Sequence, residues 1–170
     1  MTDAAPLVHL VERGAPRAEA ARARLAERFR VVVLDARESA ATLVRALDAA
    51  GVGAFNLLAT GGASRAVASL ARETGPRLLA LALESPAAPG AQDALEAPAL
   101  VLLGTRDSEP ARQAGRGWAE RIPGAHLVYV YDAGPAICDD RPDAFADVVG
   151  DFFERHEAFV ISRATTVIHP

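Results

Sequence analysis

The chain has 170 residues, 51% of them hydrophobic, and a formal net charge of −4 at pH 7. This length suits one domain with a substantial core, and the acidic balance gives no support to nucleic-acid binding. All 18 basic residues are arginines, which excludes a Walker-type phosphate loop and a Schiff-base lysine, because both need lysine. The single cysteine, Cys138, excludes an internal disulfide and a cysteine-based zinc cluster.

Targeting signals are not evident in the sequence. Its apolar runs are all shorter than the roughly 18 residues that a membrane-spanning helix needs. The first residues, MTDAAPLVHL, contain no basic region followed by an apolar one, as a secretion signal would. We therefore expect a cytoplasmic location.

Strand-like and helix-like segments alternate along the chain. In chain order, the pattern predicts a strand at Leu7–Val11, a helix at Pro16–Phe29, a strand at Arg30–Leu34, a helix at Glu38–Ala50, a strand at Phe55–Ala59, a helix at Ala63–Thr74, strands at Leu78–Leu83 and Ala99–Gly104, a helix at Glu109–Arg121, a strand at Ala125–Tyr131 and a helix at Pro142–His156. Apolar strands between helices are typical of a parallel sheet covered on both faces. We predict an α/β protein: a three-layer α/β/α sandwich with a mostly parallel, doubly wound sheet of about six strands.

Two segments interrupt this alternation. Glu84–Pro98 is a linker rich in proline, alanine and glycine, and Ala158–Pro170 is a β-rich tail after the last helix. We expect one domain at 1–157 and an extra C-terminal strand or tail at 158–170. A strand there would cover a sheet edge or pair with another subunit, which favours a homodimer, whereas a tail packed along its own domain is the alternative.

The segment Phe55–Ala71, FNLLATGGASRAVASLA, carries the most specific pattern. An apolar strand runs into a turn of small residues, Thr60 to Ala63, and then into an alanine-rich helix. This strand–turn–helix context is the one that a G-x-S-x-G nucleophile elbow needs, because small residues allow the sharp turn and close helix packing. The position where the serine is expected holds Gly61.

With these residues, the chain resembles the α/β-hydrolase superfamily from about Leu7 to Arg155. RFRVVVLDAR at Arg28–Arg37 is similar to the strand before the family's D-x-R-G-x-G loop, and Leu57–Ala71 is similar to the elbow. Further similar segments are Leu83–Pro86 before the cap insertion, Leu100–Asp107 at the strand that delivers the triad acid, and Ala119–Gly134 with Arg141–Phe153 at the end. Their order and spacing make the resemblance fairly specific.

The resemblance implies an incomplete Ser-His-Asp triad. Gly61 stands at the nucleophile position and Pro135 at the histidine position, whereas Asp107 matches the acid. The oxyanion-hole loop corresponds to Arg13-Gly14, and the cap has shrunk to the linker. Because triad chemistry needs a hydroxyl activated by a base that a carboxylate orients, we expect no catalytic residue here and a non-hydrolytic protein, a small-ligand-binding or assembly subunit.

Another register keeps a hydroxyl. Gly62-Ala63-Ser64-Arg65-Ala66 fits G-x-S-x-A and would make Ser64 the nucleophile, although no histidine falls in the family's histidine loop. Ser64 is otherwise a polar residue in the first turn of a helix. The alternative function is thus an unusual enzyme: an esterase that uses Ser64, or a non-hydrolytic isomerase, cyclase or lyase.

We expect the strand order 2-1-3-4-5-6, which reverses direction between strands 1 and 3. A ligand would bind in the crevice at the ends of these two strands, because doubly wound sheets bind ligands at such a point. Arg13 and Gly14 should face Thr60, Gly61 and Gly62, whose free N–H groups at a helix start favour a small anion. A small apolar ligand is the alternative. We expect no cofactor and no metal, since Asp139, Asp140, Asp143 and Asp147 lack calcium-loop spacing. Cys138 lacks a neighbouring histidine to activate it.

Overall fold

The computed structural model describes residues 4–14, 18–90, 95–159 and 167–168. Its strands form one parallel sheet in the order β2-β1-β3-β4-β5-β6-β7. The strands are β1 (Leu7–Val11), β2 (Val31–Asp35), β3 (Phe55–Thr60), β4 (Leu78–Glu84), β5 (Ala99–Gly104), β6 (His126–Val130) and β7 (Val167–Ile168). The predicted order of the first six strands is confirmed, with a short seventh at the edge.

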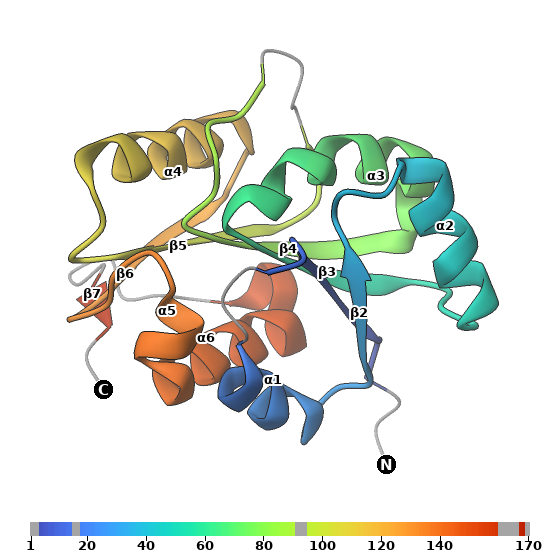
Figure 1. Ribbon diagram of the computed structural model, residues 1–170, viewed down its shortest axis with the longest axis horizontal. Helices are drawn as coiled ribbons and strands as arrows, with labels where there is room; N and C mark the ends of the chain where they lie inside the picture. Colours follow the sequence, from blue (N-terminus) through green and yellow to red (C-terminus); the bar gives the residue numbers. More distant parts are fainter. Residues whose placement is uncertain (1–3, 15–17, 91–94, 160–166, 169–170) are drawn as a thin grey trace.

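Helices cover both faces of the sheet and give the predicted three layers (Figure 1). On one face lie α1 (Glu19–Ala26), α5 (Ile137–Asp140) and α6 (Pro142–Arg155); on the other lie α2 (Ala40–Ala49), α3 (Val67–Thr74) and α4 (Glu109–Arg121). Three 3-10 turns complete the set: η1 (Gly61–Ala66), η2 (Gly75–Arg77) and η3 (His156–Ala158). Successive strand residues point to opposite faces, so the sheet divides the core in two. Phe145 and Phe152 fill one half and Trp118 the other.

Local sequence explains where several helices begin. Ser39 and Ser108 stand before α2 and α4, and their hydroxyls accept hydrogen bonds from the N–H groups of Thr42 and Ala111. Such caps satisfy N–H groups that have no partner within the helix. Pro142 occupies the first turn of α6, where a missing N–H costs nothing.

Three details differ from the sequence-based expectation. The helix predicted at Pro16–Phe29 is described only as the shorter α1, and Ala18 before it adopts a left-handed conformation, φ 47°. The helix predicted from Ala63 begins as the 3-10 turn η1 and becomes α-helical at Val67. The four-residue helix α5 was not predicted, since ICDD has too few residues to show a helical period.

The described part of the tail belongs to the chain's own sheet. β7 pairs in parallel with β6, with Val167 opposite Tyr129 and Ile168 opposite Val130, and the N–H of Tyr131 donates to the C=O of Ile168 at 3.0 Å. A strand in the tail was expected either to cover a sheet edge or to pair with another subunit. β7 covers the edge of its own sheet at β6. The remaining tail positions, 160–166 and 169–170, lie outside the described residues.

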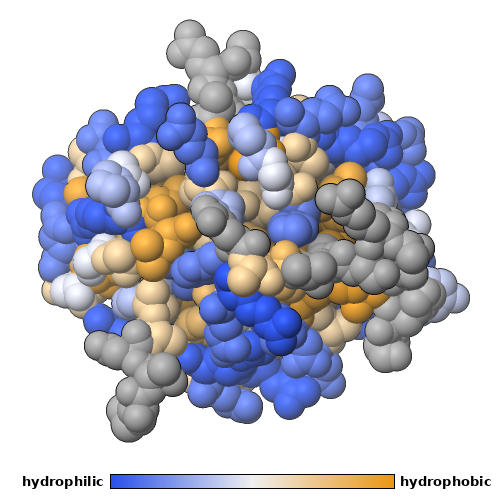
Figure 2. Space-filling model, turned by 180° about the vertical axis from the view of Figure 1, so that it is seen from behind, coloured by the Kyte–Doolittle hydropathy of each residue, from blue (hydrophilic) through white to orange (hydrophobic). Residues whose placement is uncertain are grey.

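The surface is polar at its rim and more apolar toward the middle when seen from behind (Figure 2). Among the described residues, the large hydrophobic side chains that are exposed are Val33 and Tyr131, at 45% and 51%. None of the described helices is long and apolar enough to cross a membrane.

Candidate functional site

The turn between β3 and η1 has the geometry of a nucleophile elbow without a side chain at its apex. β3 ends at Thr60 in an extended conformation, and Gly61 follows with φ +56°. A positive φ strains any residue with a Cβ and is characteristic of the sharp strand-to-helix elbow. A Cβ built on Gly61 would meet no atom within 4 Å, so the turn has room for a side chain that the sequence does not supply.

The loop after β1 faces this turn, but it contributes an acidic group. A Cβ built on Gly62 would lie 2.6 Å from both carboxylate oxygens of Glu12, which also pairs with Arg65 at 4.0 Å. The side chain of Arg13 is 82% exposed and pairs with Asp35 at 3.7 Å, and Gly14 is exposed. The residue of the loop after β1 that meets Gly62 is thus Glu12, whereas Arg13 and Gly14 were the residues expected there.

Ser64 is buried and its hydroxyl has two partners. It donates to the C=O of Gly61 at 2.9 Å and accepts from the N–H of Ala87 at 2.9 Å. The C=O of Ala87 accepts from the indole N–H of Trp118 at 2.7 Å. The hydroxyl of Ser64 therefore anchors the linker after β4 to η1. Through its N–H and its C=O, Ala87 of the linker connects η1 with α4.

Asp107 lies buried after β5. Its Oδ2 accepts from the hydroxyl of Ser85 at 2.7 Å and from the N–H of Gly104 at 2.8 Å. Its Oδ1 is buried and has no hydrogen-bond partner in the described part of the chain. Ser85 has φ 37°, a strained conformation for a residue with a Cβ. Pro135, the position that resembles the family's histidine, is exposed in the loop before α5.

A second buried carboxyl group, which sequence reasoning missed, lies at the end of β4. Glu84 is 1% exposed, its Oε1 accepts from the N–H of Cys138 at 2.6 Å, and its Oε2 lies 3.5 Å from the thiol. Burial, reinforced by the charges of Asp139 and Asp107, raises the pKa of Glu84 to about 7. The only sequence signal is its place as the last residue of a buried apolar strand.

Cys138 is an unreactive thiol in this setting. Burial raises its pKa, and the neighbouring carboxyl of Glu84 raises it further. Since the thiolate is the nucleophilic form, a raised pKa disfavours attack at neutral pH.

The histidines are held by other parts of the fold. His9 is buried in β1, where burial lowers its pKa to about 4, with Arg22 adding to the effect. His126 packs edge-on against Phe152 and Phe159, and the Nε2 of His156 lies 3.0 Å from the Oδ1 of Asn56. His169 lies outside the described residues.

The acidic residues near α5 and α6 make structural contacts. Asp139 accepts from the N–H of Ala18, Asp140 accepts from the N–H of Gly134, and Asp143 pairs with Arg24. Within the described ranges, no group of three or more His, Cys, Asp or Glu side chains is placed to hold a metal ion.

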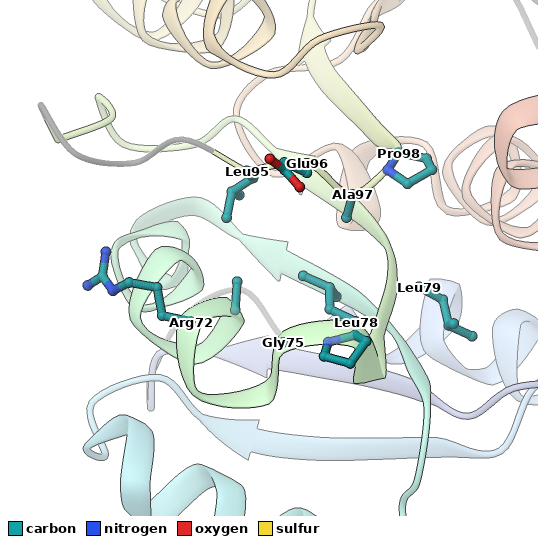
Figure 3. Close-up of a pocket in the computed structure, with 10 residues that line it drawn as sticks. Arg72, Gly75, Leu78, Leu79, Leu95, Glu96, Ala97 and Pro98 are labelled. Atoms are coloured by element: carbon teal, nitrogen blue, oxygen red, sulfur yellow. The ribbon is translucent and has the colours of Figure 1, made fainter.

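A pocket of about 560 Å³ in the described chain lies away from the elbow. It is lined by the end of α3, the start of β4 and residues 95–98 of the linker (Figure 3). In Figure 3, Leu78 and Leu95 lie on opposite sides of this pocket. It opens at the amino ends of the strands, whereas the elbow and Asp107 lie at their carboxyl ends. None of the predicted site residues lines it.

Several solved structures with the same arrangement of strands and helices are named as hydrolases, among them an esterase and a lactonase. The chain is similar to a predicted CIB-like hydrolase from Thermoplasma acidophilum (13% identity, 89% of this chain and 87% of that chain, TM-score 0.73). It is also similar to a thermophilic esterase from Thermogutta terrifontis (16% identity, 89% of this chain and 90% of that chain, TM-score 0.74). A third similar structure is the enol-lactonase from Burkholderia xenovorans LB400 (17% identity, 88% of this chain and 92% of that chain, TM-score 0.71). The chain has the α/β-hydrolase fold. No family model and no curated protein matches the sequence.

Proposed function

We propose that this protein is a non-hydrolytic α/β-hydrolase-fold protein, a small-ligand-binding or assembly subunit. The observation that carries the proposal is Gly61: it has the left-handed conformation of an elbow, φ +56°, and no side chain to attack a substrate. Nucleophilic catalysis at this turn requires a hydroxyl or thiol with a base beside it. Gly61, at the apex of the turn, has no such group.

The surroundings of the turn support this proposal. The carboxylate of Glu12 lies against Gly62, next to the place where a substrate oxyanion would need hydrogen-bond donors. A negative charge beside a developing oxyanion opposes its formation. A ligand at Thr60, Gly61 and Gly62 therefore competes with Glu12, which favours neutral ligands over the small anion that the turn alone suggests.

The alternative is an unusual enzyme, either an esterase that uses Ser64 or a non-hydrolytic isomerase, cyclase or lyase. The solved structures of the same fold are enzymes by their names, which keeps this alternative worth testing. The geometry of Ser64 disfavours it as a nucleophile, because the hydroxyl proton is directed to the C=O of Gly61 and the oxygen accepts the N–H of Ala87.

A fluorophosphonate probe, which labels activated serines, separates these functions. We expect no labelling of the purified protein and no turnover of a panel of aryl esters and lactones. Labelling that disappears in Ser64→Ala would instead establish the Ser64 esterase. An active esterase from the same fold, treated in parallel, shows that the probe is competent.

The assignment of the triad positions has its own test. Gly61→Ser combined with Pro135→His should introduce traces of ester hydrolysis, because the elbow has room for the serine and Asp107 still has a free Oδ1. Each single variant serves as a control and should remain inactive, since hydroxyl and base act as a unit. A folded double variant with no more hydrolysis than either single variant would contradict the assignment.

A further inference from the structure

β2 forms an open edge of the sheet (Figure 1). The N–H of Leu7 donates to the C=O of Arg30, and the N–H of Ala36 donates to the C=O of Val11, each at 2.9 Å. In a parallel sheet, every second residue of a strand points its N–H and C=O groups toward a given neighbouring strand. These two bonds show that the even-numbered residues of β2 point theirs toward β1. Val31, Val33 and Asp35 therefore direct their backbone N–H and C=O groups away from β1, and among these the C=O of Asp35 accepts from the N–H of Glu38 at 3.1 Å.

Among the described residues, the part of this edge from Val31 to Leu34 has little protection from pairing with another strand. Natural edge strands are protected by a proline, by charged side chains, by a bulge or by a covering segment, and in β2 the charged residue is Asp35 at its end. The sequence of β2 is VVVLD, and its register with β1 is regular throughout. Val33 is 45% exposed, and Val32 and Leu34 are half-buried. At the opposite edge of the sheet, by contrast, β7 covers β6.

We propose that two copies of this chain associate by antiparallel pairing of β2 with β2, around a two-fold axis at Val33. The residues whose backbone groups face outward recur at every second position. The edge of one copy can therefore pair with the same edge of a second copy that is turned by 180°. Val33 of each copy donates to and accepts from Val33 of the other. Val31 of each copy lies opposite Asp35, whose N–H donates to the C=O of Val31. Such a self-matching patch is what a two-fold dimer requires.

The side chains of the paired edges are also compatible. On the side of α2, Val32 of each copy lies opposite Leu34 of the other, and on the side of α1 the two Val33 side chains lie next to each other. Apolar cross-strand pairs of this kind stabilise an antiparallel ladder. Arg30 falls opposite Ala36 of the second copy and Asp35 opposite Val31, so no two like charges face each other. The second copy is therefore the occupant that the edge fits.

This interface gives the proposed assembly role a location, and its failure would leave the absence of hydrolysis untouched. Sedimentation velocity of the full chain over a hundredfold range of concentration should show a monomer–dimer equilibrium. Val33→Lys should raise the dimer dissociation constant by about tenfold or more, because it brings two like charges together at the axis. Tyr131→Lys, at the other exposed large hydrophobic residue, is the matched control and should leave the constant unchanged.

Cross-linking locates the axis independently. In a hydrogen-bonded antiparallel pair the two Val33 Cα atoms would be about 5.5 Å apart, so Val33→Cys should be joined rapidly by a short bismaleimide. Tyr131→Cys should not be, and the buried Cys138 makes the wild type a blank. A monomer at every concentration would overturn the proposal. So would a dimer that Val33→Lys leaves intact, or one that Tyr131→Cys cross-links instead.

Discussion

Replacing Glu84 by glutamine tests how this fold carries a buried carboxyl group. The glutamine keeps an acceptor for the N–H of Cys138, which donates to Oε1 at 2.6 Å, and removes a group whose pKa burial raises from 4.5 to about 7. Below pH 4.5 the carboxyl is protonated in both the folded and the unfolded chain, so the substitution changes no charge. The variant should therefore differ from the wild type mainly at higher pH.

The magnitude follows from the difference between the two pKa values. Between pH 4.5 and 7 the unfolded chain loses the Glu84 proton while the folded chain keeps it, so the wild type loses free energy of unfolding as the pH rises. Above pH 7 both states are ionised and the loss is constant. The difference of roughly 2.5 pH units corresponds to about 3 kcal/mol. Relative to the wild type, Glu84→Gln should gain that amount between pH 4 and pH 8.

His9 has the opposite effect in nearly the same range. Its pKa falls from 6.5 to about 4 because it is buried, so between pH 4 and 6.5 the unfolded chain holds a proton that the folded chain lacks. Stability therefore rises with pH over this window. In the wild type the two slopes oppose each other, and Glu84→Gln should unmask the rise due to His9.

Urea unfolding at half-unit steps from pH 4 to 8, followed by the fluorescence of the single, buried Trp118, measures this directly. Comparing the pH dependence of the two proteins cancels any constant effect of the amide on packing. Glu96→Gln, which removes an exposed carboxylate, is the control for charge alone. If Glu84→Gln and the wild type show parallel pH profiles, Glu84 is not held protonated by burial and the reasoning fails.

Three further substitutions test packing and hydrogen bonding. Gly104→Ala should lower the free energy of unfolding by about 2 kcal/mol or more, because its Cβ would lie 2.1 Å from the C=O oxygen of Ala133. Gly117→Ala in α4, whose Cβ would meet only side-chain atoms at 3.5 Å, should instead stabilise by roughly 0.5–1 kcal/mol in the same urea assay. Ser64→Ala should cost about 1–3 kcal/mol, because it leaves the N–H of Ala87 without its partner, and should speed proteolysis of the linker; unchanged proteolysis would contradict an anchoring role.

The strands could be predicted from sequence because most of them are buried on both faces. A parallel strand in the middle of a sheet is apolar at nearly every position. ALVLLG stands out for this reason, as does LVHLV apart from His9, and both strands have the predicted bounds. The strand order followed from the resemblance and from the alternation with helices. The open edge at β2 was less visible, since RVVVL also reads as a buried strand although Val33 is exposed.

The contacts that define the site could not be predicted in this way. Glu12 meets Gly62, Ser64 meets Ala87 and Glu84 meets Cys138, and each contact joins residues well apart in the sequence. Backbone direction fixes which turns meet, but which side chain reaches across depends on rotamers. That is why Arg13 was expected against the glycines and Glu12 is found there.

Gly61 spares the turn between β3 and η1 the strain that a side chain would cause there. A serine at φ +56° carries a conformational cost of the order of 1 kcal/mol or more, which a hydrolase tolerates because the strain holds its nucleophile in place. Gly61 adopts the same turn without that cost, while Ser64 and Ala63, both buried in η1, keep the turn packed beneath the linker. The elbow can therefore be retained for packing alone. On this argument Gly61→Ser should lower the stability of the protein slightly, whether or not hydrolysis appears.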